Sequence, residues 1–143
     1  MIRSLKQTDL SAIRAINAVS LGYDVSLEKT ERQFQRCSNA GGHFFLVYEN
    51  EADQVVLGYI HAQVYESLYS ETGLNILGLA VLPNFQGQGI GSALLEATEK
   101  LAKENGYTFI RLNSADHRKQ AHHFYEQHGY ISDKLQKRFI KTL

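Results

Sequence analysis

The stretch that decides the fold is Gln86-Gly87-Gln88-Gly89-Ile90-Gly91-Ser92, which follows the apolar run Ile76–Leu82 and opens the amphipathic run Ile90–Ala102. A buried strand, a glycine-dense turn and then a helix form the local architecture that holds a phosphate. Glycine permits close backbone approach and a positive φ, and first-turn N–H groups have no intrahelical partner. The helix dipole adds partial positive charge there. The stretch therefore predicts a pyrophosphate site on the main chain of Gln86–Ser92.

Strands and helices continue on both sides of this turn. Hydrophobic periodicity and capping signals predict strands over residues 2–5, 43–49, 55–66, 74–82 and 107–113, and helices over residues 9–20, 27–38, 90–102 and 117–127. Thr8 or Asp9 is expected to cap the first helix and Ser26 the second; residues 68–72 read as a loop. One or two closing strands are expected from Tyr130 onward. This order predicts a single mixed α/β domain over residues 1–143, with helices on both faces of a central sheet and a parallel crossover between residues 74 and 113.

Composition narrows the class of partner. Fifteen Lys and Arg balance fifteen Asp and Glu among 143 residues, which disfavours nucleic-acid binding because that needs a basic surface. No apolar run approaches the roughly 18 residues that a membrane span requires. The single cysteine, Cys37, has no partner for an internal disulfide and is interpreted as structural. We expect a soluble, cytoplasmic protein that binds neither nucleic acid nor membrane.

Three phosphate-binding patterns compete for the turn. A P-loop is excluded because no lysine lies near the turn, and the match to the dinucleotide pattern is weak because Ser92 or Leu94 stands where a glycine is needed. The third pattern is Gln/Arg-x-x-Gly-x-Gly/Ala after a strand that ends in Val-x-Pro, and it is met by Val81 to Gly91. This segment resembles the acetyl-CoA site of the GNAT N-acetyltransferase superfamily. Residues 121–130 resemble the second signature of that family, Ala-x-x-Phe-Tyr followed by Gly and an aromatic residue.

The resemblance implies a mostly antiparallel mixed sheet with a splayed pair of parallel strands, between which the pantetheine arm of acetyl-CoA lies. The cofactor-binding residues that it implies are Leu79, Ala80, Val81, Gln86, Gly87, Gln88, Gly89, Ile90, Gly91, Ser92, Asn113, Phe124 and Tyr125. No metal is expected, because no two histidines in the cluster at residues 117–123 stand four apart on a helix face.

Tyr125 matches the family tyrosine that protonates the departing CoA thiolate, a plausible role because a phenol is protonated at neutral pH. The sequence does not identify a single general base. Many relatives place a glutamate on the strand that corresponds to residues 74–82, but this strand contains no carboxylate. His61 is a candidate base, Glu66 and Asp24 are others, and a water chain without a dedicated base is equally consistent.

Aromatic and acidic residues outside these motifs suit a cationic acceptor; those selected are Tyr23, Asp24, Tyr65 and Glu66. The predicted function is acetyl transfer from acetyl-CoA to a primary amine of a small molecule or peptide by direct attack. The alternative is an acyl-CoA-binding sensor or non-catalytic subunit. The resemblance is compatible with a homodimer formed through C-terminal strands around Phe139, and equally with a monomer.

Overall fold

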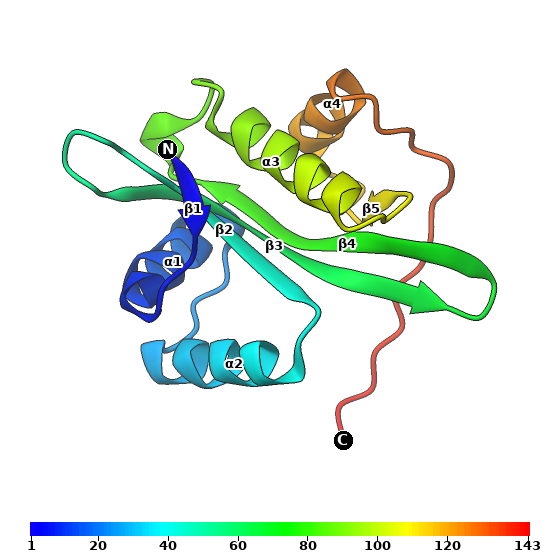
Figure 1. Cartoon of the computed structure of the whole chain (residues 1–143), viewed down its shortest axis with the longest axis horizontal. Coiled ribbons are helices and arrows are strands. Elements are labelled where there is room, and N and C mark those ends of the chain that lie inside the picture. The colour runs from blue at the N-terminus through cyan, green and yellow to red at the C-terminus, as the bar shows by residue number, and fades with distance from the viewer. The chain divides into compact units, whose positions relative to one another are not determined.

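The computed structural model describes all 143 residues (Figure 1). The chain divides into two compact units, Met1–Leu112 and Asn113–Leu143, each of which is described by itself. The single-domain expectation stays a prediction. No helix is both long enough and apolar enough to span a bilayer.

The first unit contains one five-stranded sheet in the order β1-β2-β3-β4-β5. The strands are β1 Ile2–Ser4, β2 His43–Glu49, β3 Val56–Ser67, β4 Ser70–Val81 and β5 Ile110–Leu112. Neighbours from β1 to β4 are antiparallel, and β4 and β5 are parallel. The mixed, mostly antiparallel sheet is therefore confirmed. The loop predicted at residues 68–72 is shorter than expected: Ser67 pairs with Ser70, so a tight hairpin joins β3 to β4 and only Leu68 and Tyr69 lie between the strands.

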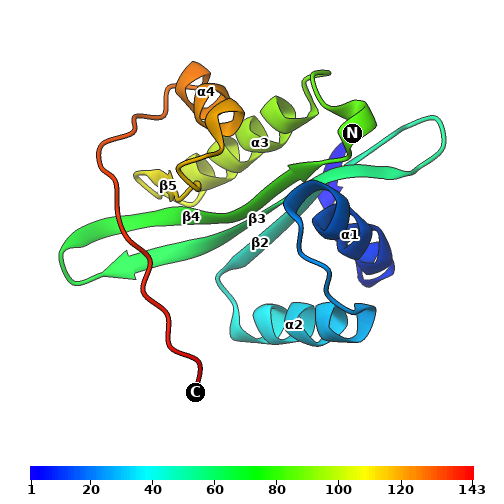
Figure 2. The same cartoon turned by 180° about the vertical axis from the view of Figure 1, so that it is seen from behind.

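Helices cover both faces of this sheet, as predicted. Helices α1 (Leu10–Ile16) and α2 (Leu27–Ala40) lie on one face, and α3 (Ile90–Glu104) lies on the other (Figures 1 and 2). Alternation along β3 supplies both cores: Tyr59 packs with Ile13 and Ile16 of α1, whereas Ala62 packs with Ala102 of α3. The predicted cap of α2 is confirmed, because the Ser26 hydroxyl accepts from the Lys29 N–H.

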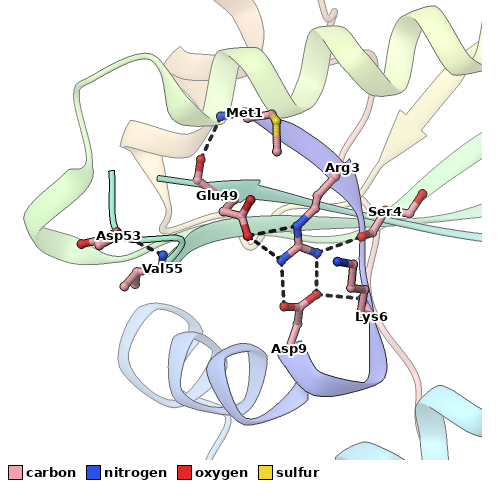
Figure 3. Close-up of polar contacts among 8 residues, drawn as sticks. All are labelled: Met1, Arg3, Ser4, Lys6, Asp9, Glu49, Asp53 and Val55. Atoms are coloured by element: carbon pink, nitrogen blue, oxygen red, sulfur yellow. Dashed lines mark hydrogen bonds and ion pairs between the residues drawn. The ribbon is translucent and has the colours of Figure 1, made fainter. Parts of the chain in front are cut away.

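The first predicted helix is shorter and more irregular than its periodicity indicated. It is α-helical only to Ile16 and continues as a π-helical turn, Asn17–Leu21, that ends at Gly22 with φ +76°. Asp9 does not cap it. The Asp9 carboxylate instead accepts the Lys6 N–H at 2.7 Å and both terminal nitrogens of Arg3, at 2.8 and 3.0 Å. Arg3 also donates to Glu49, so this network ties β1, β2 and the start of α1 together (Figure 3).

The second unit has one regular element, α4 (Lys119–Gln127). The closing strands expected from Tyr130 onward are wrong, since residues 128–143 form neither helix nor strand. All side chains from residue 131 to the end are exposed. In a strand, Ile131, Leu135 and Phe139 would share one face with Asp133 and Lys137, so this segment lacks the continuous apolar face that holds a strand on a sheet.

Candidate functional site

The parallel pair that the resemblance implied is present but short. Only Leu74–Ile76 of β4 pairs with β5, opposite Ile110–Leu112. The register of β3 against β4 then shifts between His61 and Ala62, which leaves Leu77 as an extra residue on β4. A bulge of this kind bends its strand and often ends a pairing. Residues 78–81 of β4 consequently pair with β3 alone and have no strand on their other side.

The direction of the main-chain groups along this open edge follows from antiparallel alternation. The Leu82 N–H donates to the Leu57 carbonyl at 2.8 Å, so hydrogen-bonded pairs recur at every second residue. By this alternation, the main-chain N–H and carbonyl of Ala80 both form their hydrogen bonds with Tyr59 of β3. Leu79 and Val81 direct their main-chain groups toward the open side. Of the three β4 residues selected for the cofactor arm, these two offer main-chain groups to an extended ligand, whereas the main chain of Ala80 faces β3.

Two side chains hold the last residue of this edge. The Ser20 hydroxyl donates to the Val81 carbonyl at 2.9 Å, and the Gln86 side-chain amide donates to the same oxygen at 3.1 Å. Ser20 comes from the π-helical turn and Gln86 from the glycine turn. The orientation of the Val81–Leu82 peptide, which directly follows the peptide that carries the Val81 N–H, is therefore set by contacts from both sides.

The glycine turn has the predicted conformation. Gly87 and Gly89 have φ values of +77° and +84°, and a Cβ on either would meet no atom within 4 Å. Glycine is thus required by backbone conformation, and open space borders both positions. Helix α3 begins at Ile90 without a side-chain cap, and its first main-chain bond runs from the Ala93 N–H to the Gly89 carbonyl. The N–H groups of residues 90–92 precede that bond and suit an anion.

A tyrosine that the sequence reasoning did not select lies beside this edge. The Tyr59 hydroxyl donates to the side-chain oxygen of Asn17 in the π-helical turn. A Cβ added at Gly78 of β4 would lie 3.3 Å from the Tyr59 oxygen, so the hydroxyl borders the open stretch. Burial raises the pKa of Tyr59 and keeps the phenol neutral. The alternation of residues along β3 places Tyr59 on the face that carries polar side chains. Its location beside the open edge of β4 follows only from its contact with the π-helical turn.

His61, the candidate base, faces α2 rather than open solvent. Burial, together with neighbouring His43, lowers the pKa of His61 to about 4. Its Nε2 atom lies 2.9 Å from Nδ1 of His43, and its ring stacks on Phe45 at 4.1 Å between centroids. The imidazole is therefore unprotonated at neutral pH, but it is a weak base whose outer nitrogen is already engaged. Ligand atoms of Cys37, His43 and His61 all lie within 4.8 Å of one another, a grouping that the sequence did not reveal.

The residues selected for the acceptor do not form one cluster. Tyr23 and Asp24 lie between α1 and α2, where Asp24 accepts from Arg14 at 3.2 Å. Tyr65 is six residues beyond Tyr59 on β3, a separation of about 20 Å along a strand. The Arg111 guanidinium lies 4.8 Å above the Tyr65 ring. Consecutive strand residues face opposite sides, so Glu66 points away from Tyr65.

The remaining selected residues belong to the second unit. Asn113 is its first residue, and Phe124 and Tyr125 lie on α4. The Tyr125 ring contacts Phe124 and Tyr130 edge-on, with centroids 5.2 and 5.8 Å apart. Burial raises the pKa of Tyr125, an effect that the nearby charge of Arg118 partly offsets. The phenol is therefore protonated at neutral pH, as a proton donor must be.

The protein resembles known acetyltransferases in sequence and in fold. It is 40% identical to the aminoalkylphosphonate N-acetyltransferase of Salmonella typhimurium over 65 aligned residues. The aligned segment covers 46% of this chain and 41% of that protein. An aminoglycoside acetyltransferase from an uncultured soil metagenomic sample superimposes with a TM-score of 0.81 at 25% identity, covering 100% of this chain and 95% of that one. The aminoglycoside 6'-N-acetyltransferase of Acinetobacter baumannii superimposes with a TM-score of 0.84 at 17% identity, covering 100% and 98%.

The curated sequence matches are partial, since they span 41% and 37% of the lengths of two bacterial relatives. The family model extends further, over residues 10–130, and includes both the glycine turn and the Phe124-Tyr125 motif. Together with an open β4 edge that leads into a glycine turn, this match shows that the chain belongs to the acetyltransferase (GNAT) family.

Proposed function

We propose that this chain is an acetyl-CoA-dependent N-acetyltransferase that acts on a primary amine of a small molecule or peptide. The observation that carries the proposal is the open edge of β4, where Leu79 and Val81 direct main-chain groups outward immediately before the glycine turn. An extended pantetheine arm would pair with that edge. The pyrophosphate would then meet the N–H groups of Gln86–Ser92 at the start of α3.

Transfer proceeds by direct attack. The amine nitrogen adds to the thioester carbonyl carbon, and the oxyanion that forms accepts the Val81 N–H. The C–S bond then breaks while the C–N bond is kept, and Tyr125 donates its phenolic proton to the CoA thiolate. The nitrogen gives its extra proton to water, because residues 74–82 contain no carboxylate and His61 is a weak base. Alignment of the amine with the thioester accounts for much of the rate acceleration.

The acceptor class rests on the named relatives and on charge. Their names refer to an aminoalkylphosphonate and to aminoglycosides, which carry primary amines on small molecules. Balanced charge over the chain supports a small acceptor over nucleic acid. The single unpaired cysteine is compatible with a cytoplasmic setting.

Calorimetric titration with acetyl-CoA, with NAD as comparison, tests the cofactor. Micromolar binding of acetyl-CoA and none of NAD is expected. Thiol release is then followed with an aminoalkylphosphonate, an aminoglycoside and a short peptide. Absence of acetyl-CoA binding would overturn the proposal.

A second function is favoured by one observation, the missing base. A chain with no carboxylate among residues 74–82 and a weakly basic His61 could bind acyl-CoA as a sensor without turnover. Tight acetyl-CoA binding with no thiol release from any amine, at pH values up to 9, would support this reading over the enzyme.

A further inference from the structure

Three side chains that suit a metal ion converge on the α2 side of the sheet. Cys37 lies in the last turns of α2, His43 begins β2, and His61 lies near the middle of β3. The thiol sulfur and one imidazole nitrogen from each histidine lie within 4.8 Å of one another. The closest pair, Nδ1 of His43 and Nε2 of His61, is 2.9 Å apart.

The topology explains this convergence. The Gly41-Gly42 turn reverses the chain after α2, so the end of that helix returns over the start of β2. The pairing of β2 with β3 sets His43 opposite Gln63 and Phe45 opposite His61, so the two histidines are diagonal neighbours on one face. Phe45 stacks on His61 and meets Phe34 of α2 at 5.2 Å, so aromatic rings wall one side of the cluster.

The donor set selects the kind of ion. One thiolate and two imidazoles are ligands for zinc and similar borderline transition-metal ions, whereas Mg²⁺ and Ca²⁺ require oxygen, and the cluster contains no carboxylate. Two nitrogens at about 2.0–2.1 Å from a tetrahedral ion lie about 3.3 Å apart. The two imidazole nitrogens therefore need to separate by a few tenths of an ångström, and the sulfur, which lies within 4.8 Å of both, needs to come to about 3.6 Å from them to admit an ion. The thiol loses its proton on binding.

We propose that Cys37, His43 and His61 form a three-ligand site for a Zn²⁺-type ion, with a water molecule in the fourth position. The site fastens α2 to β2 and β3 and so stabilises the first unit when it is filled. It does not depend on the acetyltransferase reaction, which as proposed uses no metal. Sequence spacing alone gave no sign of it, because the three ligands come from three different elements.

Cobalt substitution tests the ligand set directly. Untagged protein, freed of metal with a chelator, is titrated with Co²⁺ and then with Zn²⁺. We expect one equivalent of Co²⁺ to give thiolate-to-metal charge transfer in the near ultraviolet and the visible bands of a tetrahedral ion, both displaced by Zn²⁺. Cys37→Ser should abolish the charge-transfer band, and His43→Gln should weaken binding at least tenfold. The control His123→Ala removes an exposed histidine of α4 and should bind as the wild type does.

A second measurement uses the fact that Cys37 is the only cysteine. Zn²⁺ should slow the reaction of the native protein with a thiol reagent at least tenfold, and a chelator should restore the rate. The same addition should raise the midpoint of thermal unfolding of the wild type but not of Cys37→Ser. Failure to bind one equivalent of Co²⁺ or Zn²⁺, or binding that Cys37→Ser and His43→Gln leave unchanged, would overturn the site. Acetyl-CoA titration of the chelated protein reports on the proposed function separately.

Discussion

The hydroxyl of Ser20 donates to the carbonyl of Val81 at 2.9 Å, across 61 residues of sequence. This bond joins the π-helical turn after α1 to the last residue of β4, where the strand is open on one side. Since Gln86 donates to the same oxygen, the N-terminal helix, the strand end and the glycine turn meet at one peptide.

Removal of this bond should affect catalysis more than cofactor affinity. Ser20→Ala leaves Gln86 in place, so acetyl-CoA should bind within about twofold of the wild type. Loss of the bond loosens the Val81–Leu82 peptide, next to the one that carries the Val81 N–H, and should lower kcat about tenfold, equivalent to about 1.4 kcal/mol of transition-state stabilisation. Stopped thiol-release assays measure kcat. The control Ser11→Ala, at an exposed position of α1, should have the kcat of the wild type. A fall in the kcat of Ser11→Ala as large as that of Ser20→Ala would contradict the positioning role of Ser20.

The glycine turn offers a matched pair of substitutions. Gly89→Asp should abolish acetyl-CoA binding, because a carboxylate at the start of α3 repels a phosphate. Gly106 follows the other end of α3 with a similar φ of +74° and open space around it. Gly106→Asp carries the same charge and comparable backbone strain, so it should lose similar stability yet still bind acetyl-CoA in calorimetry. Normal binding by a folded Gly89→Asp protein would place the phosphate site elsewhere.

Tyr125→Phe separates proton donation from packing. The ring is retained, so the Kd for acetyl-CoA should stay unchanged, while kcat should fall by about 10²–10⁴-fold if the phenol protonates the thiolate. Burial raises the pKa of Tyr125, so the alkaline loss of wild-type kcat that this group causes should begin above the ordinary phenol value of about 10. Tyr69→Phe, at the exposed β3–β4 hairpin, is the control and should leave kcat unchanged. Wild-type turnover in Tyr125→Phe would exclude the acid role.

The Arg3–Asp9 ion pair should make the free energy of unfolding depend on pH in the acid range. Arg3 lowers the pKa of the Asp9 carboxyl, chiefly through its hydrogen bonds. A carboxyl whose folded-state pKa is depressed contributes stability above its unfolded value of about 4, and this contribution is lost as the pH falls through the lower folded value. Asp9→Asn should therefore cost about 2 kcal/mol at pH 7 and flatten the loss of stability in acid.

Urea unfolding between pH 2 and pH 7 measures this effect. Glu31→Gln, at an exposed position of α2, should leave the profile unchanged. An Asp9→Asn protein that is as stable as the wild type at pH 7 would contradict the contribution assigned to the pair.

Local sequence signals predicted the elements around the turn well. Ser26 caps α2, the mostly apolar run at residues 43–49 forms β2, and the glycine pattern produces positive φ at Gly87 and Gly89 before α3. Each of these depends on interactions within a few residues. Local pattern was insufficient elsewhere, since the loop expected at residues 68–72 is only a two-residue turn and no strand forms after Tyr130.

The sequence by itself therefore determined the family, the order of most elements and the turn before α3, because caps, periodicity and glycine conformation act locally. The tertiary structure decided which main-chain groups of β4 face its open side, since one extra residue at Leu77 resets the register. It also decided that Ser20 meets Val81, and that Cys37, His43 and His61 meet beneath α2. Contacts of this kind join residues far apart in the chain, and only the pairing of strands and the packing of helices on them bring such residues together.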